Sequence, residues 1–167
     1  MARLFLAVFP PADVIERLDE VERPEVEGVR WTKREQWHIT LRFLGEAEAE
    51  DVDRSLRGFR GSAASVRLGP VSRRLGARVL VLPAAGLGEL AAEVRTLTAD
   101  IGQPPDKRDF TGHLTLARAR KRIPATVVGL PFEAEFLATE LWLVDSELHP
   151  DGARYTQLSH WPLEVAS

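Results

Sequence analysis

The sequence predicts an α+β fold whose two halves are alike, and three observations support this prediction. The order histidine, aliphatic residue, threonine, leucine occurs twice, at residues 38–41 and 113–116. The second copy begins 75 residues after the first, close to half of the 167-residue chain. Segments with the period of a helix are intermixed with segments with the period of a strand and with hairpin turns. We therefore expect each half to supply a strand, a helix and a strand that carries the motif.

The first half follows this order. Residues 3–9 are mostly aliphatic or aromatic and stop at two prolines, as expected for a strand that leads into a helix. Apolar positions at helical spacing predict a helix over 13–22, and a brief strand is expected at 29–31. After the motif strand, a helix is predicted over 46–59. Strict alternation in the motif strand divides its side chains between two faces. One face carries Trp37, Ile39, Leu41 and Phe43, and the other carries His38, Thr40, Arg42 and Leu44.

The second half predicts a hairpin, a helix, the second motif strand and a tail of three strands. In chain order these are strands at 65–71 and 78–83 joined by a turn around Gly76, a helix at 87–101, the motif strand at 113–117, and strands at 132–136, 140–146 and 154–161. The segment His149-Pro150-Asp151-Gly152 has the composition of a turn, so we expect the last two strands to form a hairpin.

Composition and charge exclude several classes of protein. With a net charge of -3 and a pI near 5.8, the chain does not suit the coating of long nucleic acid by bulk electrostatics. It has no cysteine, which excludes disulfides, a thiol nucleophile and cysteine-based metal sites. The apolar N-terminal run is too short for a signal peptide, and no stretch approaches the roughly 20 apolar residues that span a bilayer. We expect a soluble cytoplasmic monomer with one domain over residues 1–167.

The two motifs combine residue types that suit chemistry at phosphorus. On a strand, the histidine and threonine of each motif point to one face and the aliphatic residues to the other. Histidine has an ordinary pKa of about 6.5, so two facing imidazoles can accept one proton and donate another near neutral pH. The threonine hydroxyls can bind an anionic oxygen between them. In-line displacement at phosphorus needs attacking and leaving oxygens on opposite sides, and this arrangement offers one histidine to each.

The motifs and the segments around them resemble the two-histidine phosphoesterases. The similar segments are Phe5-Leu6-Ala7-Val8, Val29-Arg30-Trp31, His38-Ile39-Thr40-Leu41-Arg42-Phe43-Leu44-Gly45-Glu46, His113-Leu114-Thr115-Leu116-Ala117-Arg118 and Gly152-Ala153-Arg154-Tyr155. They resemble the branch called RNA 2',3'-cyclic phosphodiesterases or 2'-5' RNA ligases. The resemblance implies two pseudo-symmetric lobes, each with an antiparallel sheet and helices, and an active-site cleft between them. It also implies hydrolysis of an RNA 2',3'-cyclic phosphate to a 2'-phosphomonoester, with slow ATP-independent 2'-5' joining of RNA ends.

The same resemblance implies roles for the motif residues. His38 would be the proton donor to the departing 3' oxygen, and His113 the proton acceptor that activates water. Thr40 and Thr115 would bind phosphate oxygens, and neither a metal nor a cofactor is implied. Arg118 is a further candidate phosphate ligand. Strict alternation turns Arg118 away from His113, but twist or a bulge near the strand end would turn it back.

Basic and aromatic residues near the motifs have a functional and a structural interpretation. Arg118 to Arg122, with Lys107 and Arg108, form either a basic rim for an RNA backbone or a solvated loop. Trp31 and Phe110 either stack on a base or belong to the core. These alternatives stay open at the level of the sequence.

Two details of the sequence and three alternative functions belong to this prediction. His149 and His160 lack a threonine partner and are expected in a turn and on the surface. The family often has proline directly before the second motif histidine, where this chain has Gly112. A metal hydrolase would need histidine pairs at ligand spacing, which the sequence lacks. A non-catalytic nucleotide or RNA-binding module, and a phosphodiesterase acting on small cyclic nucleotides, both fit the same motifs.

Overall fold

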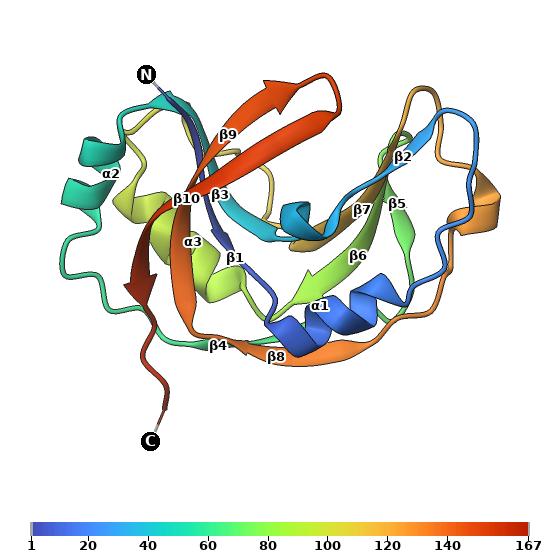
Figure 1. The fold of residues 1–167 in the computed structure, drawn as a ribbon. Coiled ribbons are helices and arrows are strands. Elements are labelled where there is room, and N and C mark those ends of the chain that lie inside the picture. Colours follow the sequence, from blue (N-terminus) through green and yellow to red (C-terminus); the bar gives the residue numbers. More distant parts are fainter. Residues whose placement is uncertain (1, 167) are drawn as a thin grey trace.

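The computed structural model describes residues 2–166, and within that range it confirms the α+β prediction (Figure 1). The strands are β1 (Ala2–Val8), β2 (Val29–Trp31), β3 (Ile39–Ala47), β4 (Ala64–Leu68), β5 (Arg73–Leu75), β6 (Val79–Ala85), β7 (His113–Ala119), β8 (Ala134–Ala138), β9 (Glu140–His149) and β10 (Gly152–Pro162). The helices are α1 (Ala12–Asp19), α2 (Ala49–Ser55) and α3 (Gly88–Leu97), with short 3-10 turns η1 (Arg34–Gln36) and η2 (Ala125–Val127).

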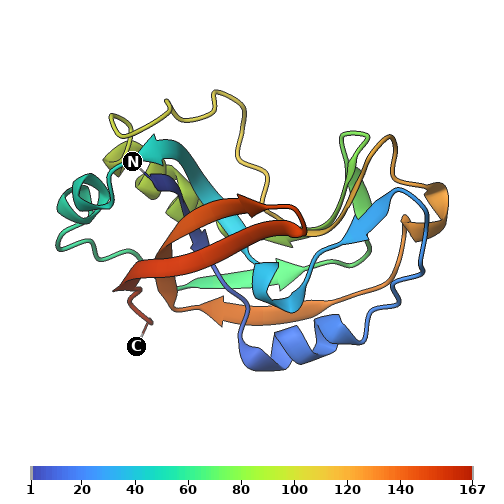
Figure 2. The same ribbon diagram turned by 45° about the horizontal axis from the view of Figure 1, so that its top comes forward.

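The strands form one antiparallel sheet in the order β10-β9-β1-β3-β7-β6-β4-β8, with β2 beside β7 and β5 beside β6. Figures 1 and 2 show that this sheet is strongly curled, with the β9–β10 hairpin at one end and β4 and β8 at the other. The four strands from β10 to β3 make one lobe, and the strands from β7 to β8 make the other. The sheet therefore has the two lobes that the resemblance implied.

Each lobe contains the same strand–helix–strand unit. In the first unit β1 leads through α1 to β3, and in the second β6 leads through α3 to β7. The two strands of each unit are antiparallel neighbours in the sheet. The prediction that each half supplies a strand, a helix and a motif strand is confirmed.

The lobes do not divide the chain at its midpoint, however. The C-terminal β9–β10 hairpin, predicted from the turn at 149–152, pairs with β1, and β2 crosses to the second lobe to pair with β7. These pairings satisfy backbone N–H and C=O groups that sheet edges would otherwise leave exposed. The predicted hairpin around Gly76 is partly wrong: this turn joins β5 to β6, whereas β4 pairs with the far end of β6 and with β8.

The main core lies between the helices and one face of the sheet. Val14 and Leu18 of α1, and Leu90 and Val94 of α3, are buried against aliphatic residues of the strands. A small second cluster of Phe5, Ala7 and Val144 lies apart from this core. All three helices are shorter than predicted, because turns replace their last residues and because residues 46 and 47 of the helix predicted over 46–59 belong to β3. In the described part of the chain, no helix has the length and apolar character needed to cross a membrane.

Candidate active site

A bulge at Leu41, the last residue of the first motif, changes the direction of the side chains on β3. Thr40 pairs with Ala7 of β1, but the next pairing along β1 joins Leu6 to Arg42. Leu41 is therefore an extra residue without a partner in β1, which is the arrangement of a β-bulge. His38 and Thr40 are partly exposed on the face opposite the main core.

Beyond this bulge, the strict alternation predicted from the sequence is wrong. Arg42 and Leu44 were expected on the face of His38, yet both are buried, and Arg42 is only 3% exposed. Phe43 was expected in the core, but it is 39% exposed and lines the cavity that contains His38. One extra residue in the strand is enough to exchange the two faces.

β7 repeats this geometry after the second motif. Its register with β6 shifts directly after Thr115, so Leu116 is the extra residue. The shift brings Arg118 onto the face that His113 and Thr115 occupy, and all three line the same cavity. The bulge therefore settles the orientation of Arg118 that alternation alone left open.

The two motif strands meet at a single pair of residues. Ile39 of β3 pairs with Leu114 of β7, and each is the aliphatic residue between the histidine and the threonine of its motif. In the antiparallel register, the histidine of each motif lies next to the threonine of the other. This junction brings both copies of the motif into one site between the lobes.

Both imidazoles are oriented by a carbonyl two residues earlier in the chain. His38 Nδ1 donates to the Gln36 carbonyl oxygen at 2.7 Å, and His113 Nδ1 donates to the Thr111 carbonyl oxygen at 2.9 Å. In the neutral rings, Nε2 therefore carries the lone pair. The Thr40 hydroxyl lies 3.0 Å from Nε2 of His38 and donates to it. Each motif thus presents an Nε2 atom that can exchange a proton.

Gly112, where the family often has proline, is required by the local packing. A Cβ atom at this position would lie 2.3 Å from the Ala84 carbonyl oxygen. The backbone of β6 approaches closely here, since the Ala84 N–H donates to the Gly112 carbonyl oxygen at 2.9 Å. The glycine allows the contact that holds the backbone directly before His113.

Aromatic rings surround His38. Its imidazole centroid lies 4.8 Å from the ring of Phe5, 5.0 Å from the edge-on ring of Tyr155 and 6.0 Å from Phe9. Burial also raises the pKa of the Tyr155 hydroxyl, which stays protonated at neutral pH. These rings provide an apolar wall that excludes water from one side of the imidazole.

This environment lowers the pKa of His38 from 6.5 to about 4. Burial is the largest cause, because it disfavours the charged imidazolium. The hydrogen bond to the Gln36 carbonyl raises the pKa, while the electrostatic influence of His113 and Arg118 lowers it further. At pH 7 and without ligand, His38 is therefore neutral.

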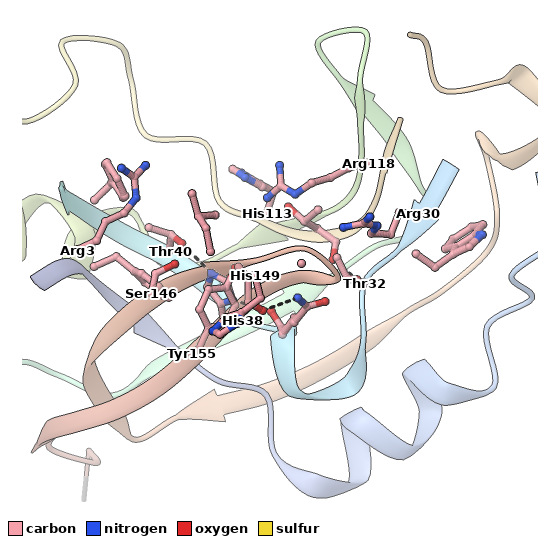
Figure 3. Close-up of a pocket in the computed structure, with 18 residues that line it drawn as sticks. Arg3, Arg30, Thr32, His38, Thr40, His113, Arg118, Ser146, His149 and Tyr155 are labelled. Atoms are coloured by element: carbon pink, nitrogen blue, oxygen red, sulfur yellow. Dashed lines mark hydrogen bonds between the residues drawn. The ribbon is translucent and has the colours of Figure 1, made fainter. Parts of the chain in front are cut away.

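The motif residues line a cavity of about 560 Å³ between the lobes (Figure 3). Its described lining includes three arginines and three histidines but no carboxylate; these are Arg3, Arg30, Arg118, His38, His113 and His149. Ser146 and Tyr155 of the β9–β10 hairpin contribute to one wall. This composition favours an anionic ligand.

Many cavity residues were not selected from the sequence, among them Arg30, Tyr155 and His149. Arg30 lies opposite Arg118 because β2 pairs with β7. Tyr155 and His149 reach the cavity because the C-terminal hairpin pairs with β1. His149 does lie at the turn, as predicted, but it also lines the site. Arg30 and Tyr155 fall within segments that carry the family resemblance, which was the available signal.

Most other candidates lie outside this cavity. Of the basic residues from 118 to 122, only Arg118 lines it. Arg108 is exposed, forms an ion pair with Asp106 at 2.9 Å and lines a neighbouring cavity. His160 is outside the cavity and lies 2.6 Å from Glu140.

The two candidate stacking residues are divided between two cavities. Trp31 lines the cavity of the motifs, and its indole N–H donates to the Pro24 carbonyl oxygen at 3.0 Å. Phe110 lines the neighbouring cavity. Within residues 2–166, no group of three or more histidine, aspartate or glutamate side chains is arranged to hold a metal ion.

A cationic cleft between two pseudo-symmetric lobes, with one imidazole from each lobe, defines a two-histidine phosphoesterase site. Comparisons with known proteins agree. Residues 8–72 match the family described as LigT like phosphoesterase. The chain is 31% identical to RNA 2',3'-cyclic phosphodiesterase of Escherichia coli, with 96% of each chain covered, and 32% identical to the enzyme of that name from Thermus thermophilus, with 96% of this chain and 90% of the relative covered.

Solved structures give the same result. The fold is similar to TT0787 of Thermus thermophilus, with a TM-score of 0.80, 32% identity and 96% and 97% of the two chains covered. It is also similar to LigT of Escherichia coli in complex with 3'-AMP, with a TM-score of 0.78, 28% identity and 97% and 98% covered. The chain belongs to the LigT-like phosphoesterase family.

Proposed function

We propose that this protein hydrolyses the terminal 2',3'-cyclic phosphate of RNA to a 2'-phosphomonoester. The observation that carries the proposal is the pair of Nε2 atoms, one from each lobe, in a cavity with three arginines and no carboxylate among its described lining residues. The relatives named RNA 2',3'-cyclic phosphodiesterase, and the complex of LigT with 3'-AMP, support this substrate class.

In the proposed reaction, the phosphate lies between the two motifs. Thr40, Thr115 and Arg118 hold its non-bridging oxygens. His113 accepts a proton from water as the new phosphorus–oxygen bond forms, and His38 donates a proton to the 3' oxygen as the old bond breaks. The atoms balance, because water supplies the hydroxyl on phosphorus and the 3' oxygen leaves as a hydroxyl. This division of roles between the histidines rests on the family resemblance.

The low pKa of His38 adds a condition to this mechanism. A neutral His38 with an unprotonated Nε2 cannot donate, so the substrate complex has to contain the imidazolium. An anionic phosphate beside Nε2 favours the charged form and raises the pKa of His38. We therefore propose that His38 gains its proton when the phosphate binds.

The remaining expectations are also proposals for this chain. RNA ends are the favoured substrates, and small 2',3'-cyclic nucleotides are the second candidate because the cavity suits a ligand of that size. Slow 2'-5' joining of RNA ends would be the same displacement with a 5' hydroxyl in place of water. Action as a cytoplasmic monomer stays a prediction from the sequence.

The test is product analysis with an oligonucleotide that ends in a 2',3'-cyclic phosphate. We expect a 2'-phosphomonoester, formed in the presence of EDTA and without added nucleotide. Turnover of adenosine 2',3'-cyclic phosphate under the same conditions compares the two substrate classes. A 3'-phosphomonoester, a requirement for a divalent ion, or tight binding without turnover would each contradict the proposal.

A further inference from the structure

The two lobes differ at one equivalent position of their motif strands. In both strands the bulge turns the fifth residue after the motif histidine toward the cavity. On β7 this residue is Arg118, whereas on β3 it is Phe43. One lobe therefore presents a guanidinium, and the other presents an aromatic ring that is 39% exposed.

A guanidinium is nevertheless present on the Phe43 side. The Cζ atom of Arg3, on β1, lies 5.1 Å from the ring centroid of Phe43, within the range of a cation–π contact. Arg3 lines the same cavity as the two motif histidines. In Figure 3, Arg3 and Arg118 lie on opposite sides of His38.

The N–H donors of Arg3 are available to a ligand. Within residues 2–166, Arg3 makes no ion pair, although Glu46 faces it across the β1–β3 register. The contact with Phe43 orients the guanidinium without using its N–H groups, because it involves the face of the ring. Arg3 is thus an oriented, exposed cation at the end of the cavity opposite Arg118.

The open space is larger than one phosphate requires. The cavity of about 560 Å³ is joined by a neighbouring cavity of about 570 Å³, and Thr40, Phe43 and His113 line both. Phe43 therefore stands where the two cavities meet. A ligand longer than one nucleotide can extend from the histidines past Arg3 and Phe43.

We propose that Arg3, held in place by Phe43, binds a second phosphate of the substrate: the phosphodiester between the terminal nucleotide and its neighbour. This inference rests on the proposed function and names the substrate class, an oligonucleotide rather than a mononucleotide. The reacting phosphate lies between the histidines beside Arg118, and the next phosphate along the chain meets Arg3. Arg3 is a substrate-positioning residue and takes no part in proton transfer.

The test compares two substrates that share the reacting end. They are adenosine 2',3'-cyclic phosphate and the adenylyl dinucleotide with the same cyclic end, and kcat/KM is measured for both. In Arg3→Gln, we expect kcat/KM to fall about tenfold more for the dinucleotide than for the mononucleotide, since only the dinucleotide carries the second phosphate. Arg57→Gln is the matched control, because Arg57 is exposed and lines neither cavity.

Two further measurements separate this role from a structural one. The preference for the dinucleotide is the ratio of its kcat/KM to that of the mononucleotide. Rising salt should reduce this preference in the native protein and leave it nearly constant in Arg3→Gln. Phe43→Leu should lose the same preference, and the double variant should lose no more than Arg3→Gln alone, because the two residues act as one unit. If Arg3→Gln lost kcat/KM equally on both substrates, so that its preference for the dinucleotide stayed that of the native protein, the proposal would be overturned.

Failure of the proposed function gives a different result. If the native protein turned over neither substrate, the hydrolysis itself would be contradicted. Calorimetry with 3'-AMP and with the adenylyl dinucleotide ending in a 3'-phosphate then decides on the second phosphate site. The site is supported if Arg3→Gln binds the dinucleotide about tenfold more weakly than the native protein does and binds 3'-AMP equally well. It is overturned if the native protein and the variant bind the dinucleotide with equal affinity.

Discussion

At the scale of single residues, His38 stands out because its surroundings disfavour the form in which it would act as an acid. Its pKa is about 4 in the folded protein, against 6.5 as the ordinary value. Between these pH values the unfolded chain binds a proton that the native protein does not bind. The contribution of the neutral His38 to the free energy of unfolding is therefore fully present above pH 6.5, and it is lost as the pH drops toward 4.

This linkage predicts a pH-dependent difference between the native protein and His38→Phe, which keeps a ring against Phe5. The variant has no imidazole to protonate, so the native protein should lose about 3 kcal/mol relative to it between pH 7 and pH 4. Urea unfolding at a series of pH values gives the free energies. Parallel curves for the two proteins would show that burial does not hold His38 in its neutral form.

Several residues of the candidate site could be predicted from the sequence, because the information lies within each motif. The repeated order of residues identifies two histidines and two threonines without any knowledge of the fold. Arg30, His149 and Tyr155 could not be placed in the same way. They reach the cavity through strand pairings between segments far apart in the chain, and no local period reports such pairings.

At the scale of secondary-structure elements, the bulges after the motifs decide which side chains face the cavity. The hydrophobic period of the sequence could not predict these bulges. An extra residue shifts the register of one strand against its neighbour, but no particular residue type in the sequence marks its position. On β7 the bulge turns Arg118 into the site, while Arg120, two residues later, lines neither cavity.

We therefore expect Arg118→Gln to lower kcat/KM by roughly 10- to 100-fold, the loss of one charged hydrogen bond to the phosphate. Arg120→Gln, an adjacent cation with the same change, should alter kcat/KM less than threefold. Steady-state kinetics on the oligonucleotide substrate measure both effects. Similar losses in the two variants would mean that the basic segment acts by its overall charge and that the bulge is unimportant for binding.

The same bulge gives Arg42 a structural role. Its guanidinium is buried and donates to the carbonyl oxygens of Thr98 and Ile101, directly after α3, at 3.0 and 2.9 Å. It also donates to the Phe43 carbonyl oxygen at 2.8 Å. The Thr98 and Ile101 carbonyls follow the last residue of α3, where intrahelical partners are lacking and a cation is favoured.

Arg42→Met should consequently lower the free energy of unfolding by about 3 kcal/mol, because it leaves several buried carbonyl oxygens without donors. Arg54→Met is the control: Arg54 is exposed and pairs with Asp51 within α2, so we expect a loss below about 1 kcal/mol. Chemical denaturation of both variants gives the comparison. An equally small effect at Arg42 would show that other groups or water satisfy these carbonyls.

At the scale of the whole molecule, the repeated strand–helix–strand unit was predictable, whereas the exchange of strands between chain halves was not. The spacing of the motifs reveals the repeat. The pairing of the C-terminal hairpin with β1, and of β2 with β7, depends on which edges remain open after the two units meet. That is a property of the assembled sheet. That residues 1–167 form a single domain stays a prediction.

The meeting of the two lobes at Ile39 and Leu114 gives the molecule one site with an imidazole from each lobe. The rate of hydrolysis should then follow a bell-shaped curve with pH, because one group has to be deprotonated and the other protonated. The two apparent pKa values belong to the coupled pair. A rate that rises or falls with pH in one step would indicate that a single imidazole takes part.

The most direct measurement is single-turnover hydrolysis of the oligonucleotide 2',3'-cyclic phosphate by His38→Ala, His113→Ala and the double variant. Each single change should slow turnover by about 10² to 10⁴ while leaving substrate binding largely intact, and the double variant should lose less than the product of the two effects. His160→Ala, outside the cavity, should react at the native rate. Near-native turnover by either folded single variant would contradict the paired acid–base mechanism and favour a binding module instead.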